Sequence, residues 1–155
     1  MTAPAPTRYA FDVIGHPAHQ GSKRHVGGGR MVEMSKKVGP WRDSVAHAAM
    51  AAMGAGPGLT GPVELLVTFQ VPMPASRRAV DRHRGWRWAD RRPDLDKLLR
   101  STLDGLTASG IIEDDARVVA IHAHMIEVAH GWTGAKVRLC TGAFSLLSQM
   151  QADYP

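Results

Sequence analysis

The sequence is short of the features that mark secreted or membrane proteins. It has a single cysteine, Cys140, which excludes an internal disulfide and fits a reducing compartment. No apolar run approaches the ~20 residues that a membrane-spanning helix needs. The N-terminal stretch MTAPAPTRYAFDV lacks the charged start and apolar core of a signal peptide. We therefore expect a cytoplasmic protein without membrane association.

The chain also lacks internal repeats and a linker between domains. Its 155 residues are typical of one domain, and they are enough to bury a core without disulfides or structural metals. We therefore expect residues 1–155 to form a single domain.

Hydrophobic periodicity and turn residues divide the chain into short elements. The patterns predict strands over 8–15, 63–71, 116–128 and 135–140, and helices over 40–53 and 94–109. This order, β-α-β-α-β-β, predicts an α+β fold with a mixed β-sheet and two main helices. The stretch at about 76–92 has neither a helical nor a strand period, so we expect a mobile basic loop there.

The basic residues gather in two segments of a chain whose formal net charge is +5. The segment from Arg77 to Arg92 holds seven arginines and two aspartates, an excess that equals the net charge of the chain. Arginines interleaved with Trp86 and Trp88 suit contact with nucleic acid, because guanidinium groups pair with phosphates and rings stack on unpaired bases. A solvated surface loop with two core tryptophans is the alternative. The residues predicted to bind DNA are Lys23, Arg24, Arg30, Arg77, Arg78, Arg82, Arg84, Arg87, Arg91 and Arg92.

The acidic residues are concentrated in one other segment, RRPDLDKLLRSTLDGLTASGIIEDDARV, which spans 91–118. It holds six of the fourteen acidic residues of the chain. A structural interpretation is available, because Asp94 is a good helix N-cap and Asp96 favours the first turn. In this interpretation Arg100 bridges Asp96 and Asp104, which lie four residues away on either side along the helix.

A metal site is the second interpretation of the same carboxylates. If the turn after the helix folds Asp114 and Asp115 back toward the helix start, three or four carboxylates converge and repel one another. Such a cluster needs a proton or a cation, and oxygen donors favour Mg²⁺ or Mn²⁺. Metal ions held by aspartates beside a basic surface are typical of nucleases. The residues alone leave both interpretations open.

The same segment resembles the RusA family of Holliday-junction resolvases. The shared pattern is Asp-x-Asp at a helix start, a basic residue one turn later, Leu-Asp-x-Leu, and an Asp-Asp pair that opens the next strand. The spacing fits without gaps over 91–118, and the arrangement of the flanking segments is also similar. The resemblance implies a Mg²⁺-dependent homodimeric endonuclease, in which Mn²⁺ can substitute. Its expected substrate is branched DNA in the form of a four-way junction.

The resemblance also implies roles for individual residues. Asp94, Asp96 and Asp115 match the catalytic carboxylates of the family, and we expect them to hold the metal together with their neighbour Asp114. Asp104 matches a recurrent helix acid.

Two positions depart from the family pattern. Arg100 stands where the family usually has a catalytic lysine, and Lys97 stands where asparagine is common. Arginine supplies a fixed positive charge but no transferable proton. We therefore expect either Arg100 or Lys97 to be the catalytic cation that neutralises the developing charge. Two other functions remain as alternatives, a non-catalytic nucleic-acid-binding module and a nuclease for other branched DNA.

Overall fold

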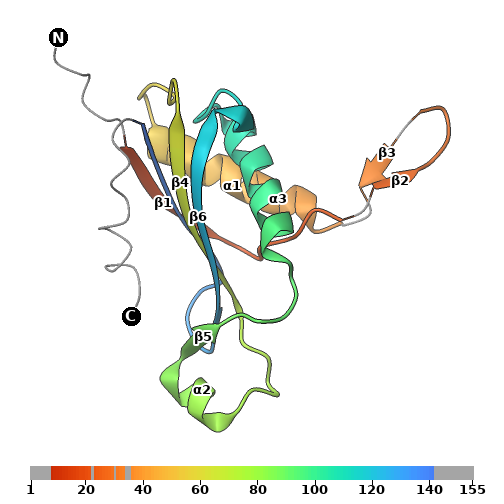
Figure 1. Cartoon of the computed structure of the whole chain (residues 1–155), viewed down its shortest axis with the longest axis vertical. Coiled ribbons are helices and arrows are strands. Elements are labelled where there is room, and N and C mark those ends of the chain that lie inside the picture. The colour runs from red at the N-terminus through yellow and green to blue at the C-terminus, as the bar shows by residue number, and fades with distance from the viewer. Residues whose placement is uncertain (1–7, 22, 30, 34–35, 142–155) are drawn as a thin grey trace.

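The computed structural model describes residues 8–21, 23–29, 31–33 and 36–141 (Figure 1). The elements, in chain order, are β1 (Arg8–Ile14), β2 (Lys23–His25), β3 (Met31–Glu33), α1 (Val38–Met53), β4 (Val63–Pro72), α2 (Ala79–Arg84), β5 (Trp86–Trp88), α3 (Leu95–Ser109), the 3-10 turn η1 (Asp115–Arg117), β6 (Val118–Val128) and β7 (Gly134–Thr141). The predicted α+β fold with two main helices is confirmed. None of the described helices is both long and apolar enough to cross a membrane.

Five strands form one mixed sheet in the order β1-β7-β4-β6-β5. Only β4 and β6 pair in parallel, and the other neighbours are antiparallel. Parallel neighbours need a long crossover, and α3 lies within the connection from β4 to β6. Strands β2 and β3 form a separate two-stranded hairpin that stands away from the sheet (Figure 1).

Helices α1 and α3 bury their apolar sides against one face of the sheet. Alternate residues of β4 point toward them, as expected for a strand in which successive side chains face opposite ways. Burying one such side chain completely contributes roughly 1.5–3 kcal/mol. The fully buried core side chains include Leu65, Val67 and Phe69 from β4, Trp41 and Val45 from α1, and Leu98 and Leu106 from α3.

Two contacts fix α3 against α1. The indole N–H of Trp41 donates a hydrogen bond of 3.1 Å to Thr102 Oγ1 in the buried interface. At Gly105 the helices approach so closely that an added Cβ would lie 2.8 Å from Val45 Cβ and 2.9 Å from the carbonyl oxygen of Arg42. Only glycine fits this position without moving a helix.

The segment at about 76–92 differs from the expected loop, because it contains α2 and β5. Strand β5 pairs with the end of β6, and both elements are too short to give a periodic signal in the sequence. A buried ion pair holds this segment to the sheet. Arg77 is buried, and its Nε donates to Glu127 at 2.7 Å while its terminal nitrogen donates to Asp90 at 2.7 Å. These hydrogen bonds raise the pKa of Arg77 further and lower the pKa of Asp90.

The close contact at Gly105 leads to a stability prediction. We expect Gly105→Ala to lower the free energy of unfolding by up to about 2 kcal/mol, because an overpacking cost of ~1–3 kcal/mol is offset only in part by the ~1 kcal/mol gained in helix propensity. Gly39→Ala in α1 is the matched control, since its Cβ would meet no atom within 4 Å. Urea denaturation of both variants gives the comparison. Equal stability changes would show that Gly105 does not limit the approach of the helices.

Candidate active site

A cleft of about 580 Å³ lies along the solvent-facing side of α3. Three parts of the chain border it: the loop after β1, the outer face of α3, and η1. The lining residues are Gln20, Gly21, Asp96, Lys97, Arg100, Asp104 and Asp115. The cleft thus gathers three carboxylates and two cations in one place.

The amphipathic pattern of α3 determines which residues face the cleft. Asp96, Arg100 and Asp104 are four residues apart, which places them on one side of the helix. The opposite side carries Leu98 and Leu106, which are fully buried in the core. Because burial of the leucines sets the rotation of the helix, it also turns the charged stripe outward. With a rise of ~1.5 Å per residue, Asp96 and Asp104 are separated by ~12 Å along the axis.

Asp115 reaches the cleft because the chain after α3 is held in place by core packing and by a backbone hydrogen bond to the segment before β4. Ile111 and Ile112 are fully buried, and the N–H of Leu59 donates a hydrogen bond of 2.8 Å to the carbonyl oxygen of Ile111. This attachment places η1 near the C-terminal end of α3, where β6 also begins (Figure 1). Asp115 therefore lines the same cleft as Asp96 but approaches it from the C-terminal end of α3. The sequence had suggested instead that the chain folds Asp115 back to the N-terminal end of the helix.

Asp94 lies outside the lining of this cleft. It is the N-cap residue of α3, as predicted, but its side chain makes no capping hydrogen bond. Its carboxylate instead lies 2.8 Å from the ammonium of Lys97, and this hydrogen bond holds the pKa of Asp94 below its ordinary value. Lys97 lines the cleft, so the Asp94–Lys97 pair stands at its border.

Asp114 and Asp104 have partners of their own. The carboxylate of Asp114 accepts a hydrogen bond of 2.8 Å from the N–H of Ala116, which caps η1. Asp104 pairs with Arg42 of α1 at 2.6 Å. The predicted bridge from Arg100 to Asp104 is therefore wrong, because α1 supplies a closer cation. Arg100 forms no ion pair with any residue in the described part of the chain.

The carboxylates of the cleft suit a hard divalent cation in their chemistry, but they do not form a complete site. Asp96 and Asp115 offer oxygen donors that are not engaged in ion pairs within the described residues. Across residues 8–21, 23–29, 31–33 and 36–141, no three acidic, histidine or cysteine side chains are grouped closely enough to ligate one ion. Mg²⁺ commonly takes one or two protein carboxylates together with water and substrate phosphates. The donors present fit that kind of site.

The predicted DNA-binding residues fall into three groups. Arg77 is buried and held by Glu127 and Asp90, so its guanidinium is not available to DNA, contrary to the prediction. Arg87 is largely buried and pairs with Asp90 at 2.9 Å. Five arginines are exposed: Arg78, Arg82, Arg84, Arg91 and Arg92. Lys23 and Arg24 lie on β2, where only their backbone is described, and Arg30 lies outside the described residues.

The loop after β1, which forms one wall of the cleft, was not predicted from the sequence to be part of the site. The N–H of Gln20 donates to the carbonyl oxygen of Lys97 at 3.3 Å, and the hydroxyl of Ser101 donates to the carbonyl oxygen of Ala18 at 2.7 Å. These bonds fasten the loop after β1 to the first turns of α3. They join residues about eighty positions apart, and no local sequence signal points to them.

A comparison with protein families agrees with the resemblance of the acidic segment. A family profile described as "Endodeoxyribonuclease RusA" matches residues 15–139, which is most of the chain. The match includes the cleft and every element from α1 to β6. No curated protein matches the chain.

Asp114 and Asp115 provide a matched pair for testing metal binding in the cleft. We expect Asp115→Asn to lower the Mn²⁺ affinity of the DNA-free protein about ten-fold or more, because it removes a charged oxygen donor from the cleft. Asp114→Asn should leave the affinity unchanged, since asparagine can still accept the hydrogen bond from Ala116. Water-proton relaxation during Mn²⁺ titration measures both affinities. Equal losses in the two variants would contradict the assignment of Asp115 to the cleft.

Proposed function

The chain belongs to the RusA family of endodeoxyribonucleases, and from that premise we propose that it resolves four-way DNA junctions by metal-dependent hydrolysis of two opposed strands. The observation that carries the proposal is the cleft on α3, where Asp96, Arg100 and Asp115 lie together. These residues occupy the positions of the family's carboxylates and catalytic cation. We place this activity in the cytoplasm of a bacterial or phage-infected cell, where branched DNA is formed.

Asp96 and Asp115 are the proposed protein ligands of Mg²⁺ or Mn²⁺ in the cleft, joined by Asp94. When bound, such an ion polarises a phosphoryl oxygen and makes water a better nucleophile near neutral pH. Asp94 is paired with Lys97 in the DNA-free structure, and exposed ion pairs of this kind are weak. Asp94 can therefore exchange Lys97 for a stronger cation. Asp114 keeps η1 in place through its cap, so that Asp115 faces the cleft.

Arg100 is the proposed cation that contacts the scissile phosphate. Of the two basic residues in the cleft, Lys97 is engaged by Asp94, whereas Arg100 has no ion-pair partner among the described residues. A guanidinium group can donate two parallel hydrogen bonds to phosphate oxygens and so offset the negative charge that develops during hydrolysis. It does not release a proton, so the leaving oxygen takes its proton from water or from the Lys97 ammonium that also lines the cleft.

Two segments that project from the fold are proposed to bind the arms of the junction. The β2–β3 hairpin and the α2–β5 segment both project from the end of the fold where α3 begins (Figure 1). The exposed arginines 78, 82, 84, 91 and 92 belong to or adjoin the second segment. Phosphate contacts of this kind position the protein on DNA and do not read its sequence.

An unprotected strand edge supports the proposed homodimer. The stretch Val118–His124 of β6 has no strand partner on its outer side within the described residues, because β5 pairs only with residues 126–128 and Ala89 bonds to Met125. Val119 and Ile121 on this stretch are 58% and 40% exposed. Exposed edges are usually guarded by lysine, proline or a bulge; this stretch has neither lysine nor proline, and its one register shift against β4 lies at its start, at Val119. A two-fold dimer would also match the symmetry of a four-way junction.

The nuclease proposal is tested with Asp96→Asn on a synthetic four-way junction. We expect cleavage in Mg²⁺ to fall by at least about a hundred-fold, more than losses typical of groups that only support a metal ligand. Junction binding should persist, since the exposed arginines are unchanged. Parallel reactions with flap and fork DNA identify the preferred substrate. Unaltered cleavage would contradict the site, and binding without cleavage by the wild-type protein would favour a non-catalytic module.

The dimer proposal is tested by placing a charge on the free edge of β6. We expect Ile121→Glu to convert the protein to a monomer in sedimentation-velocity experiments, because two glutamates would face each other across the two-fold axis. Met50→Glu is the control, since Met50 is 52% exposed on α1, far from that edge in the fold. Dissociation by Met50→Glu instead would place the dimer contact on α1, and a monomeric wild-type protein would refute the dimer.

A further inference from the structure

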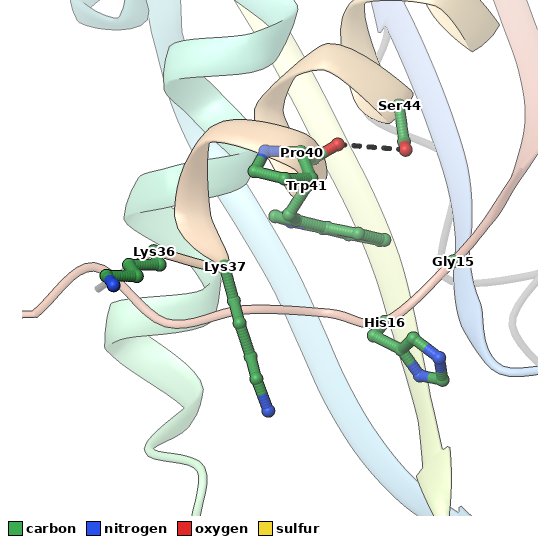
Figure 2. A pocket seen from close by; sticks show the side chains of 7 residues that line it. All are labelled: Gly15, His16, Lys36, Lys37, Pro40, Trp41 and Ser44. Carbon is green, nitrogen blue, oxygen red and sulfur yellow. Dashed lines mark hydrogen bonds between the residues drawn. The ribbon is translucent and has the colours of Figure 1, made fainter.

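A second pocket, separate from the cleft on α3, opens where the chain enters α1 (Figure 2). Its volume is about 360 Å³, which lies within the roughly 300–1,000 Å³ range of small-molecule sites. The residues that line it are Gly15, His16, Lys36, Lys37, Pro40, Trp41 and Ser44. None of them belongs to the proposed catalytic residues.

The pocket combines an apolar wall with a cationic rim. Pro40 and the edge of the Trp41 ring form the wall, and the hydroxyl of Ser44 already donates a hydrogen bond of 2.9 Å to the carbonyl oxygen of Pro40 (Figure 2). Lys36 and Lys37 are exposed, and neither forms an ion pair with a described residue. The side chain of Lys37 extends to the side of the α1 start on which His16 lies, whereas the side chain of Lys36 points away from the other lining residues (Figure 2).

The charge around the rim favours an anion. The first turn of α1 contains no acidic residue, so the positive end of the helix dipole adds to the two lysines. An apolar wall beside an anion-attracting rim matches a nucleotide, which has a flat base and a phosphate. We propose that this pocket binds one unpaired nucleotide of the cleaved DNA strand, with the base against the apolar wall at Pro40 and the phosphate beside Lys37. The assignment of that strand rests on the function proposed above.

The loop after β1 places the pocket close to the proposed cleavage site. Gly15 lines the pocket and Gln20 lines the cleft, so the same short loop borders both. Five residues span at most ~17 Å, and successive phosphates of a DNA strand advance by ~3.4 Å along the duplex axis. The pocket therefore lies within about five nucleotide steps of the edge of the cleft at Gln20. A base read there gives the enzyme a sequence preference near the scissile bond.

Ser44 is the position from which the pocket can be filled. Ser44→Phe places a ring in the pocket, and Ser44→Leu fills it less completely. His47→Phe is the matched control, because His47 is exposed on the same helix and does not line the pocket. Lys37→Gln tests the phosphate contact, with Lys37→Arg as the conservative variant. Thermal melting identifies any variant that fails to fold, in which case Ser44→Leu replaces Ser44→Phe.

The experiment measures the affinity for four-way junctions in which each nucleotide near the cut is replaced, one at a time, by an abasic residue. Fluorescence anisotropy with the Asp96→Asn background keeps the DNA intact. We expect one abasic position to weaken binding about ten-fold, in line with the loss of one base contact. That abasic position should not change the DNA affinity of Ser44→Phe, and it should weaken the DNA affinity of His47→Phe as much as that of the protein without either substitution. Lys37→Gln should reduce the salt dependence of binding by about one phosphate contact, and Lys37→Arg should not.

The proposal is overturned if no abasic position matters, or if the sensitivity persists in Ser44→Phe. Cleavage by the protein with aspartate at position 96 is recorded separately on the same junctions. Base-dependent binding without any cleavage would keep the nucleotide pocket and refute the resolvase. Cleavage without base-dependent binding would keep the resolvase and refute the pocket.

Discussion

The packing of α3 against both α1 and the sheet is the constraint on which the site depends. Gly105 allows the two helices to touch, and the hydrogen bond from Trp41 to Thr102 fixes their register. With Leu98 and Leu106 turned into the core, the opposite side of α3 must present Asp96 and its charged neighbours to solvent. The geometry of the cleft is thus a consequence of apolar burial on the other side of one helix.

The distribution of charge explains how carboxylates persist in a basic protein. Asp94 and Asp104 are offset by Lys97 and Arg42, which leaves Asp96 and Asp115 as the acids of the cleft without an ion pair in the described part of the chain. Part of the positive charge is likewise internal, because Arg77 stabilises the attachment of the α2–β5 segment and is not on the surface. The protein therefore separates arginines that hold the fold from arginines that are free to meet phosphates.

Local patterns in the sequence predicted α3, its charged stripe and the order of the main strands, because each depends on residues within one or two helical turns or on strand alternation. The contacts that complete the site are not local. Asp115 reaches the cleft through the bond between Leu59 and Ile111, and Asp104 finds Arg42 across the helix interface. The ordered α2–β5 segment depends on Glu127, fifty residues beyond Arg77. Such pairings follow from the assembled fold and leave no periodic trace in the sequence.

The central claim is that the outer side of α3 and η1 together hold the catalytic metal. An anomalous difference map from crystals of the protein with junction DNA and Mn²⁺ tests it most directly. We expect a peak in the cleft, within about 2.0–2.6 Å of carboxylate oxygens from both Asp96 and Asp115. Mn²⁺ bound elsewhere on the protein, with these two carboxylates free of metal beside the DNA, would contradict it.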